Sequence, residues 1–250
     1  MTKQPYNFDG NKLLIFDGHA LAFHSWFTSE PARVLPGFIR MVNYAVERHG
    51  PTHVIVTFDP PPPTFRHKLF EDYKAHRPPV PEGLLEDCER VCKRLDEMGV
   101  IYCSAEGYEA DDVIGTLATK ADKYKFSTVI VTSDLDLLQL VTPNTEVEVF
   151  SQYWDRRHFD EESARRRFDG LSPKNIPDYK ALVGDPSDNL AGVPGIGVVS
   201  AEAVLGRYSS LDKVYENLDA ISQMPIRGAK RLSKILEENR EQAFLMRTLT

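Results

Sequence analysis

Three aspartates each follow directly after a run of apolar residues that has the composition of a buried strand. Asp17 follows KLLIF (12–16), Asp59 follows HVIVTF (53–58), and Asp134 follows VIVTS (129–133). A single aspartate after a strand usually forms a turn or caps a helix. Three at equivalent positions favour a shared site, because ligands bind outside the carboxyl ends of the strands in an open α/β sheet. We therefore expect these carboxylates to meet at one edge of a sheet.

Six further acids lie in three short motifs. GYEADD (107–112) supplies Glu109, Asp111 and Asp112, SDLDL (133–137) supplies Asp136, and GDPSDN (184–189) supplies Asp185 and Asp188. Glu109 and Asp112 are three residues apart at a helix start, so they share a face of that helix. The helix dipole also favours acids in a first turn, and GDPSDN alone is typical of an Asx turn, so a structural role stays open for both motifs.

Carboxylates gathered at one site need positive charge, because like charges within about 4–6 Å would otherwise force some of them to protonate. Magnesium and manganese ions suit carboxylate oxygens and water as ligands. Two such ions about 4 Å apart activate a water and stabilise the leaving oxygen of a phosphodiester. No Ser/His/Asp or Cys/His set has a recognisable spacing. The pattern predicts hydrolysis with two or more Mg²⁺ (or Mn²⁺) ions.

The overall charge of −7 argues against a nucleic-acid partner only at first sight. When the nine clustered acids are set aside, 28 acidic residues stand against 30 basic ones.

The chain has no apolar run of about 18 residues, its first residues are polar, and its three cysteines form no paired framework. We expect a cytoplasmic protein with no membrane span, and a monomer is favoured.

The order of apolar patterns predicts an α/β fold with a mainly parallel central sheet and helices on both faces. Strands are expected at 12–16, 53–58, 100–103, 127–132 and 146–150, with helices at 38–49, 84–98 and 111–124. Short helices broken by Gly and Pro follow, at 161–168, 175–183, 198–205, 211–217, 228–239 and 241–249. We therefore expect a core over residues 1–170 and a helical lobe over 171–250.

Two other segments have compositions that suit a polynucleotide. TFRHKLFEDYKAHR (64–77) interleaves cations with aromatic residues, as in a grip on single-stranded DNA, although an exposed surface loop is the simpler alternative. GVPGIG (192–197) opens a helix, and its glycine backbone can approach a phosphate closely. The candidate DNA contacts are Arg66, Tyr73, Lys74, Arg77, Gly192, Gly195 and Gly197.

Taken together and in order, these segments resemble the 5′ nuclease domain of bacterial DNA polymerase I and the wider flap endonuclease family. The resemblance covers nearly the whole chain. The segments that carry it are FDGHALAF (16–23), VTFDPPPPTFRHKLFEDYKAHRPPVP (56–81), GYEADDVIGTLA (107–118), VTSDLDLLQL (131–140) and YKALVGDPSDNLAGVPGIG (179–197).

The resemblance implies a structure-specific 5′-3′ exonuclease or flap endonuclease of DNA replication or repair, either as a stand-alone nuclease or as an isolated nuclease fragment. Its fold would be PIN-like, with an arch or clamp near residues 60–98 and a helix-hairpin-helix-type DNA-binding motif in the lobe. Substrates would be DNA with a 5′ flap, a 5′ overhang or a nick, and a DNA polymerase is left open as a partner.

The resemblance also assigns residues. All nine acids would hold metal ions: Asp17, Asp59, Glu109, Asp111, Asp112, Asp134, Asp136, Asp185 and Asp188. Lys74 and Arg77 would contact the scissile phosphate, with Asp17 and Asp59 also catalytic. The hairpin Gly192–Gly197 would bind duplex backbone, with a potassium ion on its carbonyls.

Three positions depart from the family pattern. His24 stands where an arginine is usual, Leu135 replaces a lysine, and Val198-Val199 stand where Lys-Thr is common after the hairpin. These changes affect recognition of the 5′ end and the grip on the duplex, while every predicted metal ligand is present.

Three other functions compete with this interpretation. A catalytically weak DNA-binding scaffold of the same fold would lack some of the acids. A PIN-like metal-dependent RNase would share them, but the hairpin and the basic segment favour DNA by family analogy. A small-molecule phosphatase would need neither the basic segment nor the helical lobe.

Overall fold

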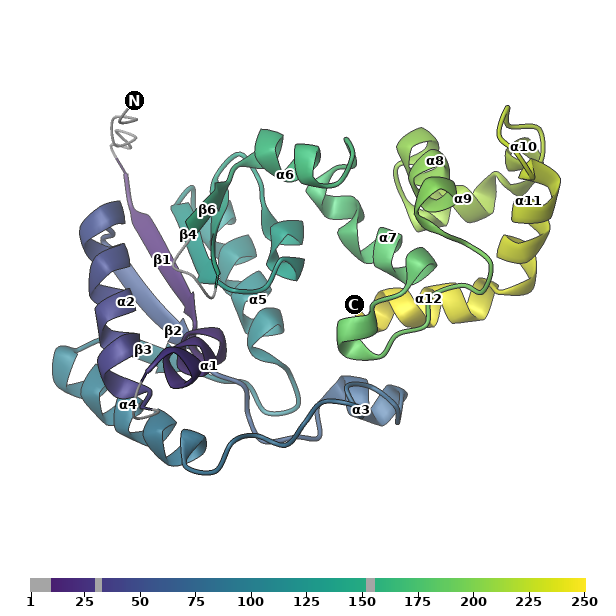
Figure 1. Cartoon of the computed structure of the whole chain (residues 1–250). Coiled ribbons are helices and arrows are strands. Elements are labelled where there is room, and N and C mark those ends of the chain that lie inside the picture. The colour runs from purple at the N-terminus through teal and green to yellow at the C-terminus, as the bar shows by residue number, and fades with distance from the viewer. Residues whose placement is uncertain (1–9, 30–32, 152–155) are drawn as a thin grey trace. The chain divides into compact units, whose positions relative to one another are not determined.

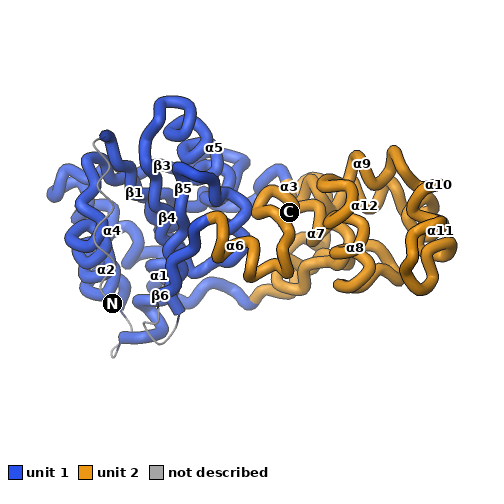
Figure 2. Tube along the Cα trace, turned by 90° about the horizontal axis from the view of Figure 1, so that it is seen from above, with its two compact units in different colours: residues 1–65, 78–160 blue, residues 66–77, 161–250 orange. Residues whose placement is uncertain are grey.

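A computed structural model describes residues 10–29, 33–151 and 156–250. The chain divides into two compact units (Figure 2). Residues 1–65 and 78–160 form the first, which we call the sheet unit. Residues 66–77 and 161–250 form the second, the helical unit, so a short segment from the first third of the sequence belongs to the helical unit.

A six-stranded sheet, in the order β3-β2-β1-β4-β5-β6, forms the centre of the sheet unit. The strands are β1 (Lys12–Asp17), β2 (His53–Thr57), β3 (Ile101–Cys103), β4 (Ser127–Thr132), β5 (Thr145–Phe150) and β6 (Arg156–Phe159). The first five are mutually parallel, and β6 runs antiparallel to β5. The predicted, mainly parallel sheet is confirmed, with β6 as an additional edge strand.

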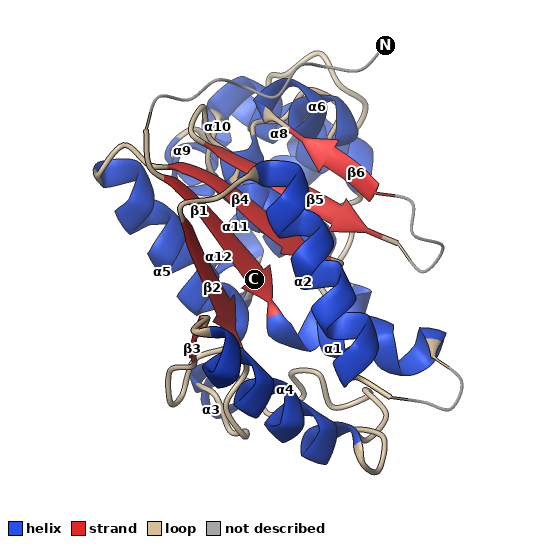
Figure 3. Ribbon diagram, turned by 90° about the vertical axis from the view of Figure 1, so that its left-hand side faces the viewer, coloured by secondary structure: helices blue, strands red, loops and turns tan. Residues whose placement is uncertain are grey.

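Helices cover both faces of this sheet (Figure 3). Four long ones are α1 (Gly18–Thr28), α2 (Leu35–His49), α4 (Leu84–Met98) and α5 (Ala110–Lys123). Leu14 and Phe16 of β1 point to the face covered by α1, α2 and α4, where they join one buried cluster with Phe38 and Leu84. The other face packs against α5. The sheet is therefore buried on both sides, which explains its continuous apolar strands.

The carboxylate of Glu148 on β5 is completely buried in the sheet unit. It accepts hydrogen bonds from Arg156 Nη1 (2.7 Å) and pairs with His49 Nε2 (3.0 Å) and Arg48 Nε (3.3 Å). Burial raises the pKa of Glu148, but these hydrogen bonds and positive charges outweigh it and lower the pKa to about 2. The network ties β5 to α2 and to the edge strand β6.

We expect Glu148→Gln to destabilise the protein by about 3 kcal/mol, because it leaves the cations around it without a counter-charge. Because the folded-state pKa is lowered, the carboxylate stabilises the fold above its unfolded pKa and loses that effect as pH falls toward about 2. Chemical denaturation at pH 7 and at pH 3 measures both effects. Equal stability of Glu148→Gln and the parent at pH 7 would contradict this assignment.

The helical unit consists of short helices packed around one buried core (Figure 1). Its helices are α6 (Glu161–Arg167), α7 (Ile176–Val183), α8 (Val198–Tyr208), α9 (Leu211–Glu216), α10 (Leu218–Ile221), α11 (Ala229–Glu238) and α12 (Arg240–Leu249). The short α3 (Phe65–Leu69) begins at the end of the sheet unit and continues into this one. No helix among the described residues has the length and apolar character needed to cross a membrane.

Candidate nuclease site

Asp17 lies at the carboxyl end of β1, where its buried side chain has two structural partners. Its Oδ1 accepts a hydrogen bond from the backbone N–H of Ala20 (3.0 Å), which caps α1. Its Oδ2 accepts a hydrogen bond from the hydroxyl of Thr132 at the end of β4 (2.8 Å). The strand β1 and the neighbouring strand β4 therefore fix this carboxylate together.

Thr132 also positions the acids that follow β4. Its hydroxyl oxygen accepts a hydrogen bond from the backbone N–H of Asp134 (3.0 Å). The carboxylate of Asp134 in turn accepts one from the backbone N–H of Asp136 (2.8 Å). Thr132 thus links Asp17 to the loop that carries the other two acids.

Asp59 connects the end of β2 to the acidic start of α5. Its Oδ1 accepts a hydrogen bond from the backbone N–H of Ala110 (2.6 Å), and its Oδ2 lies 3.2 Å from His19 Nδ1. Glu109 and Asp112 form a capping box, in which Asp112 accepts a hydrogen bond from the backbone N–H of Glu109 (2.9 Å). Asp111 lies in the same helical turn. The edge expected from the sequence therefore carries seven of the nine acids, all in the sheet unit.

The electrostatics of this edge are unfavourable to several negative charges. Burial, followed by the charges of Asp59 and Asp134, raises the pKa of Asp17 to about 6, against the lowering effect of its hydrogen bonds from Ala20 and Thr132. As they stand, no three His, Cys, Asp or Glu side chains in the described ranges are arranged to hold a metal ion.

Asp185 and Asp188 belong to the helical unit, where protein cations already neutralise them. Asp185 accepts hydrogen bonds from Lys180 Nζ (2.6 Å) and from the backbone N–H and hydroxyl of Ser187 (2.9 and 2.6 Å). Burial raises the pKa of Asp185, but these partners outweigh it and lower the pKa. Asp188 lies 2.7 Å from Arg77 Nη2 and 3.8 Å from Lys74 Nζ. Positive charges thus surround Asp185 and Asp188, whereas negative charges act on Asp17.

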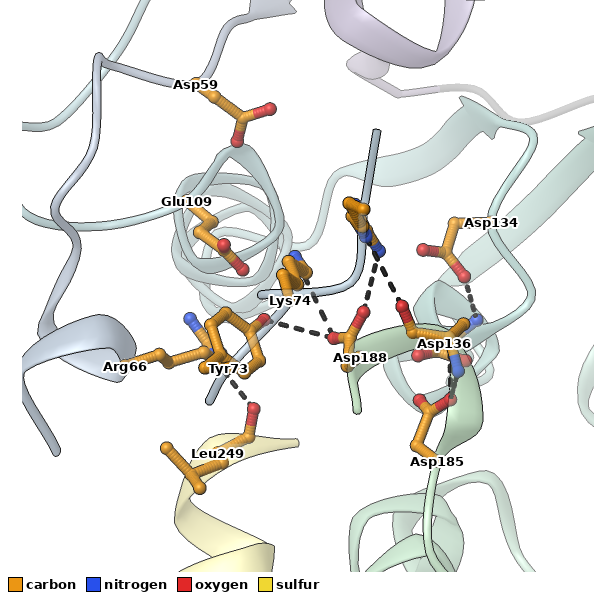
Figure 4. A network of polar contacts seen from close by, with 12 residues as sticks. Asp59, Arg66, Tyr73, Lys74, Glu109, Asp134, Asp136, Asp185, Asp188 and Leu249 are labelled. Carbon is orange, nitrogen blue, oxygen red and sulfur yellow. Dashed lines mark hydrogen bonds and ion pairs between the residues drawn. The ribbon is translucent and has the colours of Figure 1, made fainter. Parts of the chain in front are cut away.

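The basic and aromatic segment 66–77 is folded onto the helical unit (Figure 4). The ring of Tyr73 is buried in the core of that unit, and its hydroxyl donates to Asp188 Oδ2 (3.0 Å). Arg66 is buried too, and its Nε donates to the carbonyl of Leu249 (2.8 Å). Both side chains therefore have internal partners, and their contacts with DNA stay predictions.

The glycine hairpin lies between α7 and α8. Gly192 is buried with a φ of +67°, and an added Cβ would come within 2.3 Å of the backbone N of Gly184. Its carbonyl accepts a hydrogen bond from Gln242 Nε2 (2.5 Å). Gly195 and Gly197 are exposed, and α8 begins directly after Gly197. Gly192 thus has a packing role, whereas the exposed pair leaves the amino end of α8 open to an anion.

Three neighbours that contact the acids were not singled out in the sequence. Thr132 and His19 each stand two residues from an aspartate, inside the motifs VTSDLDLLQL and FDGHALAF. Lys180 lies five residues before Asp185 and has no motif of its own. At the departing position His24, burial and then the charges of Arg156 and Arg40 lower the pKa, so His24 is neutral at pH 7.

Two family models match the chain. The 5′-3′ exonuclease N-terminal resolvase-like domain matches residues 12–169, and the 5′-3′ exonuclease C-terminal SAM fold matches residues 171–250. The chain belongs to the 5′-3′ exonuclease family. It is therefore a nuclease, and the α/β core followed by a helical SAM-type fold confirms the predicted fold class.

Curated relatives of this 5′-3′ exonuclease are DNA polymerases I. The enzyme of Chloroflexus aurantiacus is 37% identical over 250 residues, covering 95% of the chain and 26% of the polymerase. The enzyme of Bacillus subtilis is 34% identical over 247 residues, covering 95% and 27% respectively. The chain thus spans about a quarter of the length of these relatives.

Solved structures share the fold of this exonuclease at low sequence identity. The T5 D15 protein co-crystallised with metal ions has a TM-score of 0.78 at 20% identity and covers 96% of this chain and 89% of its own. The bacteriophage T5 D15 flap endonuclease in a pseudo-enzyme-product complex with DNA and metal ions has a TM-score of 0.75 at 21% identity, covering 96% and 88%. At such identities the likeness establishes the fold.

Proposed function

We propose that this 5′-3′ exonuclease hydrolyses DNA at 5′ flaps, 5′ overhangs and nicks, using two or more divalent ions, Mg²⁺ or Mn²⁺. The observation that carries the proposal is the buried Asp17 carboxylate beside Asp59 and Asp134. Burial and the negative charges of Asp59 and Asp134 raise its pKa to about 6. Divalent cations relieve such repulsion, and oxygen-rich sites are the ones that magnesium and manganese prefer.

The residues of the sheet unit fit this role by their chemistry. Asp17, Asp59 and Asp134 act on one another electrostatically. Together with the other acids of the same edge they would hold the ions, the further ligands being Glu109, Asp111, Asp112 and Asp136. Asp185 and Asp188 stay predicted ligands, although protein cations accompany both in the helical unit. Bound ions would supply an activated water and stabilise the leaving oxygen.

The chain's own residues position the acids. Thr132 fixes Asp17 and Asp134 at the same time, and the start of α5 fixes Asp59. Lys74 and Arg77 would contact the scissile phosphate, where positive side chains stabilise the charge of the transition state. The hydrogen bonds from Thr132 and Ala110 hold the acids in place before DNA binds, so that less conformational entropy is lost on binding.

We infer that the exposed glycines of the hairpin Gly192–Gly197 contact duplex backbone, with a potassium ion on the hairpin carbonyls. T5 D15 flap endonuclease is a protein of this fold with DNA and metal ions bound.

The curated relatives are DNA polymerases I about four times as long as this chain. A DNA polymerase acting on the same substrate in the cytoplasm is therefore the protein partner that we propose.

Chelation with EDTA is expected to stop cleavage of a 5′-labelled flap duplex and to lower the melting temperature, because the ions bind only the folded protein. Magnesium or manganese should restore both, and calcium should restore only the melting temperature, since its looser coordination suits the transition state poorly. Cleavage by a metal-free preparation in excess EDTA at the parent rate would disprove the metal mechanism.

A further inference from the structure

The segment 66–77 is attached to the helical unit by hydrogen bonds with a turn more than 100 residues later, each accepted by a backbone carbonyl. The backbone N–H of Lys74 donates to the carbonyl of Asp188 (3.1 Å). Arg77 Nε of the segment donates to the carbonyl of Ser187 (3.3 Å). In the opposite direction, Asn189 Nδ2 of the turn donates to the carbonyl of Asp72 (2.8 Å). The turn 185–189 therefore binds the segment at three points.

The Asp188 side chain adds three contacts at the centre of this attachment (Figure 4). Its Oδ2 accepts the hydroxyl hydrogen of Tyr73 (3.0 Å) and lies 3.8 Å from Lys74 Nζ. Its Oδ1 accepts a hydrogen bond from Arg77 Nη2 (2.7 Å). One carboxylate thus holds both cations that are proposed to contact the scissile phosphate.

The backbone at Lys74 is held in an uncommon conformation. Its φ is +55°, in the left-handed region that is unfavourable for a residue with a Cβ. Such a conformation persists where the surroundings determine it, and it is frequent at functional sites. Here Tyr73, buried beside Lys74, and the carbonyl of Asp188 provide that constraint. The Lys74 ammonium also lies 4.9 Å from the centre of the Tyr73 ring.

We propose that Asp188 and Tyr73 form a clasp that positions Lys74 and Arg77, the two cations that the proposed function assigns to the scissile phosphate. In the clasp, both cations lie beside the Asp188 carboxylate. A DNA phosphate is also an oxyanion, so the same two cations are arranged to meet a group of that kind. Asp188 and Tyr73 are positioning residues in this proposal, because they act through Lys74 and Arg77. The inference rests on the proposed function in one respect, which is that Lys74 and Arg77 contact the scissile phosphate.

Limited trypsin digestion in EDTA tests the clasp without using catalysis. Trypsin cuts after Lys74, whereas the bond after Arg77 precedes Pro78 and resists the protease. We expect Asp188→Asn to speed cleavage of the Lys74–Ala75 bond by about fivefold or more, because loss of charged hydrogen bonds makes local opening more frequent. Tyr73→Phe, which keeps the buried ring, should speed it by a smaller factor.

Tyr124→Phe, at an exposed tyrosine in the sheet unit, is the matched control and should leave the digestion rate unchanged. Parent-like cleavage after Lys74 in both clasp variants would overturn the proposal and leave Asp188 as a metal ligand only. If Asp188→Asn fails to fold, Tyr73→Phe alone decides between the two outcomes. The melting temperature of each variant distinguishes local opening from general instability.

Kinetics give a second readout that depends on the cations. With saturating magnesium, Tyr73→Phe should lower kcat on a 5′-flap duplex by about three- to tenfold with little change in KM, since misplaced cations weaken transition-state stabilisation. An unchanged kcat beside faster digestion would make the clasp structural and overturn its positioning role. If the parent chain cleaves no DNA, the proposed function fails, while the trypsin result still decides whether the clasp exists.

Discussion

Replacing Asp134 by asparagine is expected to lower single-turnover cleavage of DNA by on the order of 10³-fold in magnesium, because a metal position is weakened. The same change should leave metal-free DNA affinity equal to the parent's or higher. Asp134→Asn keeps the shape of the side chain and removes one of the negative charges that raise the pKa of Asp17. At an effective dielectric near 20, unit charges about 4 Å apart interact by roughly 4 kcal/mol before screening.

The opposite signs of these two effects separate a metal site from a structural network. If Asp134 only ordered the loop through its bond from Asp136, the variant would lose stability and cleave in proportion to its folded fraction. Melting temperature, metal-free affinity and single-turnover rate should be measured on one sample. Asp219→Asn, at an exposed position in the first turn of α10, serves as the charge-matched control. A folded Asp134→Asn protein that cleaves at the parent rate would remove Asp134 from the site.

Lys74→Ala is expected to reduce turnover by about 10²-fold with a much smaller loss of DNA affinity. The reason is that a cation at the transferring phosphate acts mainly on charge that develops in the transition state. Single-turnover rates and binding constants on the same 5′-flap duplex separate the two effects.

Lys123→Ala is the control, because Lys123 is exposed in the last turn of α5, at the opposite end of that helix from its acidic start. It should change neither quantity appreciably. Equal losses of affinity and turnover in Lys74→Ala would instead make Lys74 a simple binding contact.

The sheet and its acidic edge could be predicted because their signals are local. Each strand is a short apolar run followed by an acid, and parallel pairing of β1, β2 and β4 then brings the ends together. The hydrogen bonds through Thr132 and Ala110 show that this edge is tightly organised around Asp17 and Asp59. The family matches confirm the fold class and the nuclease assignment that followed from these motifs.

Four of the named elements were not predicted, namely α1, α3, α10 and β6, and two of them show why. The helix α1 has apolar side chains on several faces, in GHALAFHSWFT, so no clean stripe marks it. The strand β6, in RRHF, is polar rather than apolar. On the neighbouring strand β5, Glu148 pairs with Arg156 and Glu146 pairs with His158. Neither pattern has the periodicity on which sequence-based assignment depends.

The attachment of segment 66–77 to the helical unit had no signal in the sequence at all. Arg77 and Asp188 are 111 residues apart, and nothing in either motif specifies the other. The mixture of cations and aromatics predicted a grip on single-stranded DNA and left an exposed surface loop as the alternative. It gave no sign that the ring of Tyr73 is buried in the helical unit, with the cations of the segment beside Asp188.

Cleavage of three substrates by the same preparation tests the central claim most directly. A 5′-labelled flap duplex, single-stranded RNA and a chromogenic phosphomonoester should be compared in magnesium, with Asp17→Asn as the inactive control. The proposed function predicts rapid cleavage of the flap duplex near its junction, little or no hydrolysis of the other two substrates, and loss of cleavage in Asp17→Asn. Preferred hydrolysis of RNA or of the phosphomonoester, or full activity of a folded Asp17→Asn protein, would contradict it.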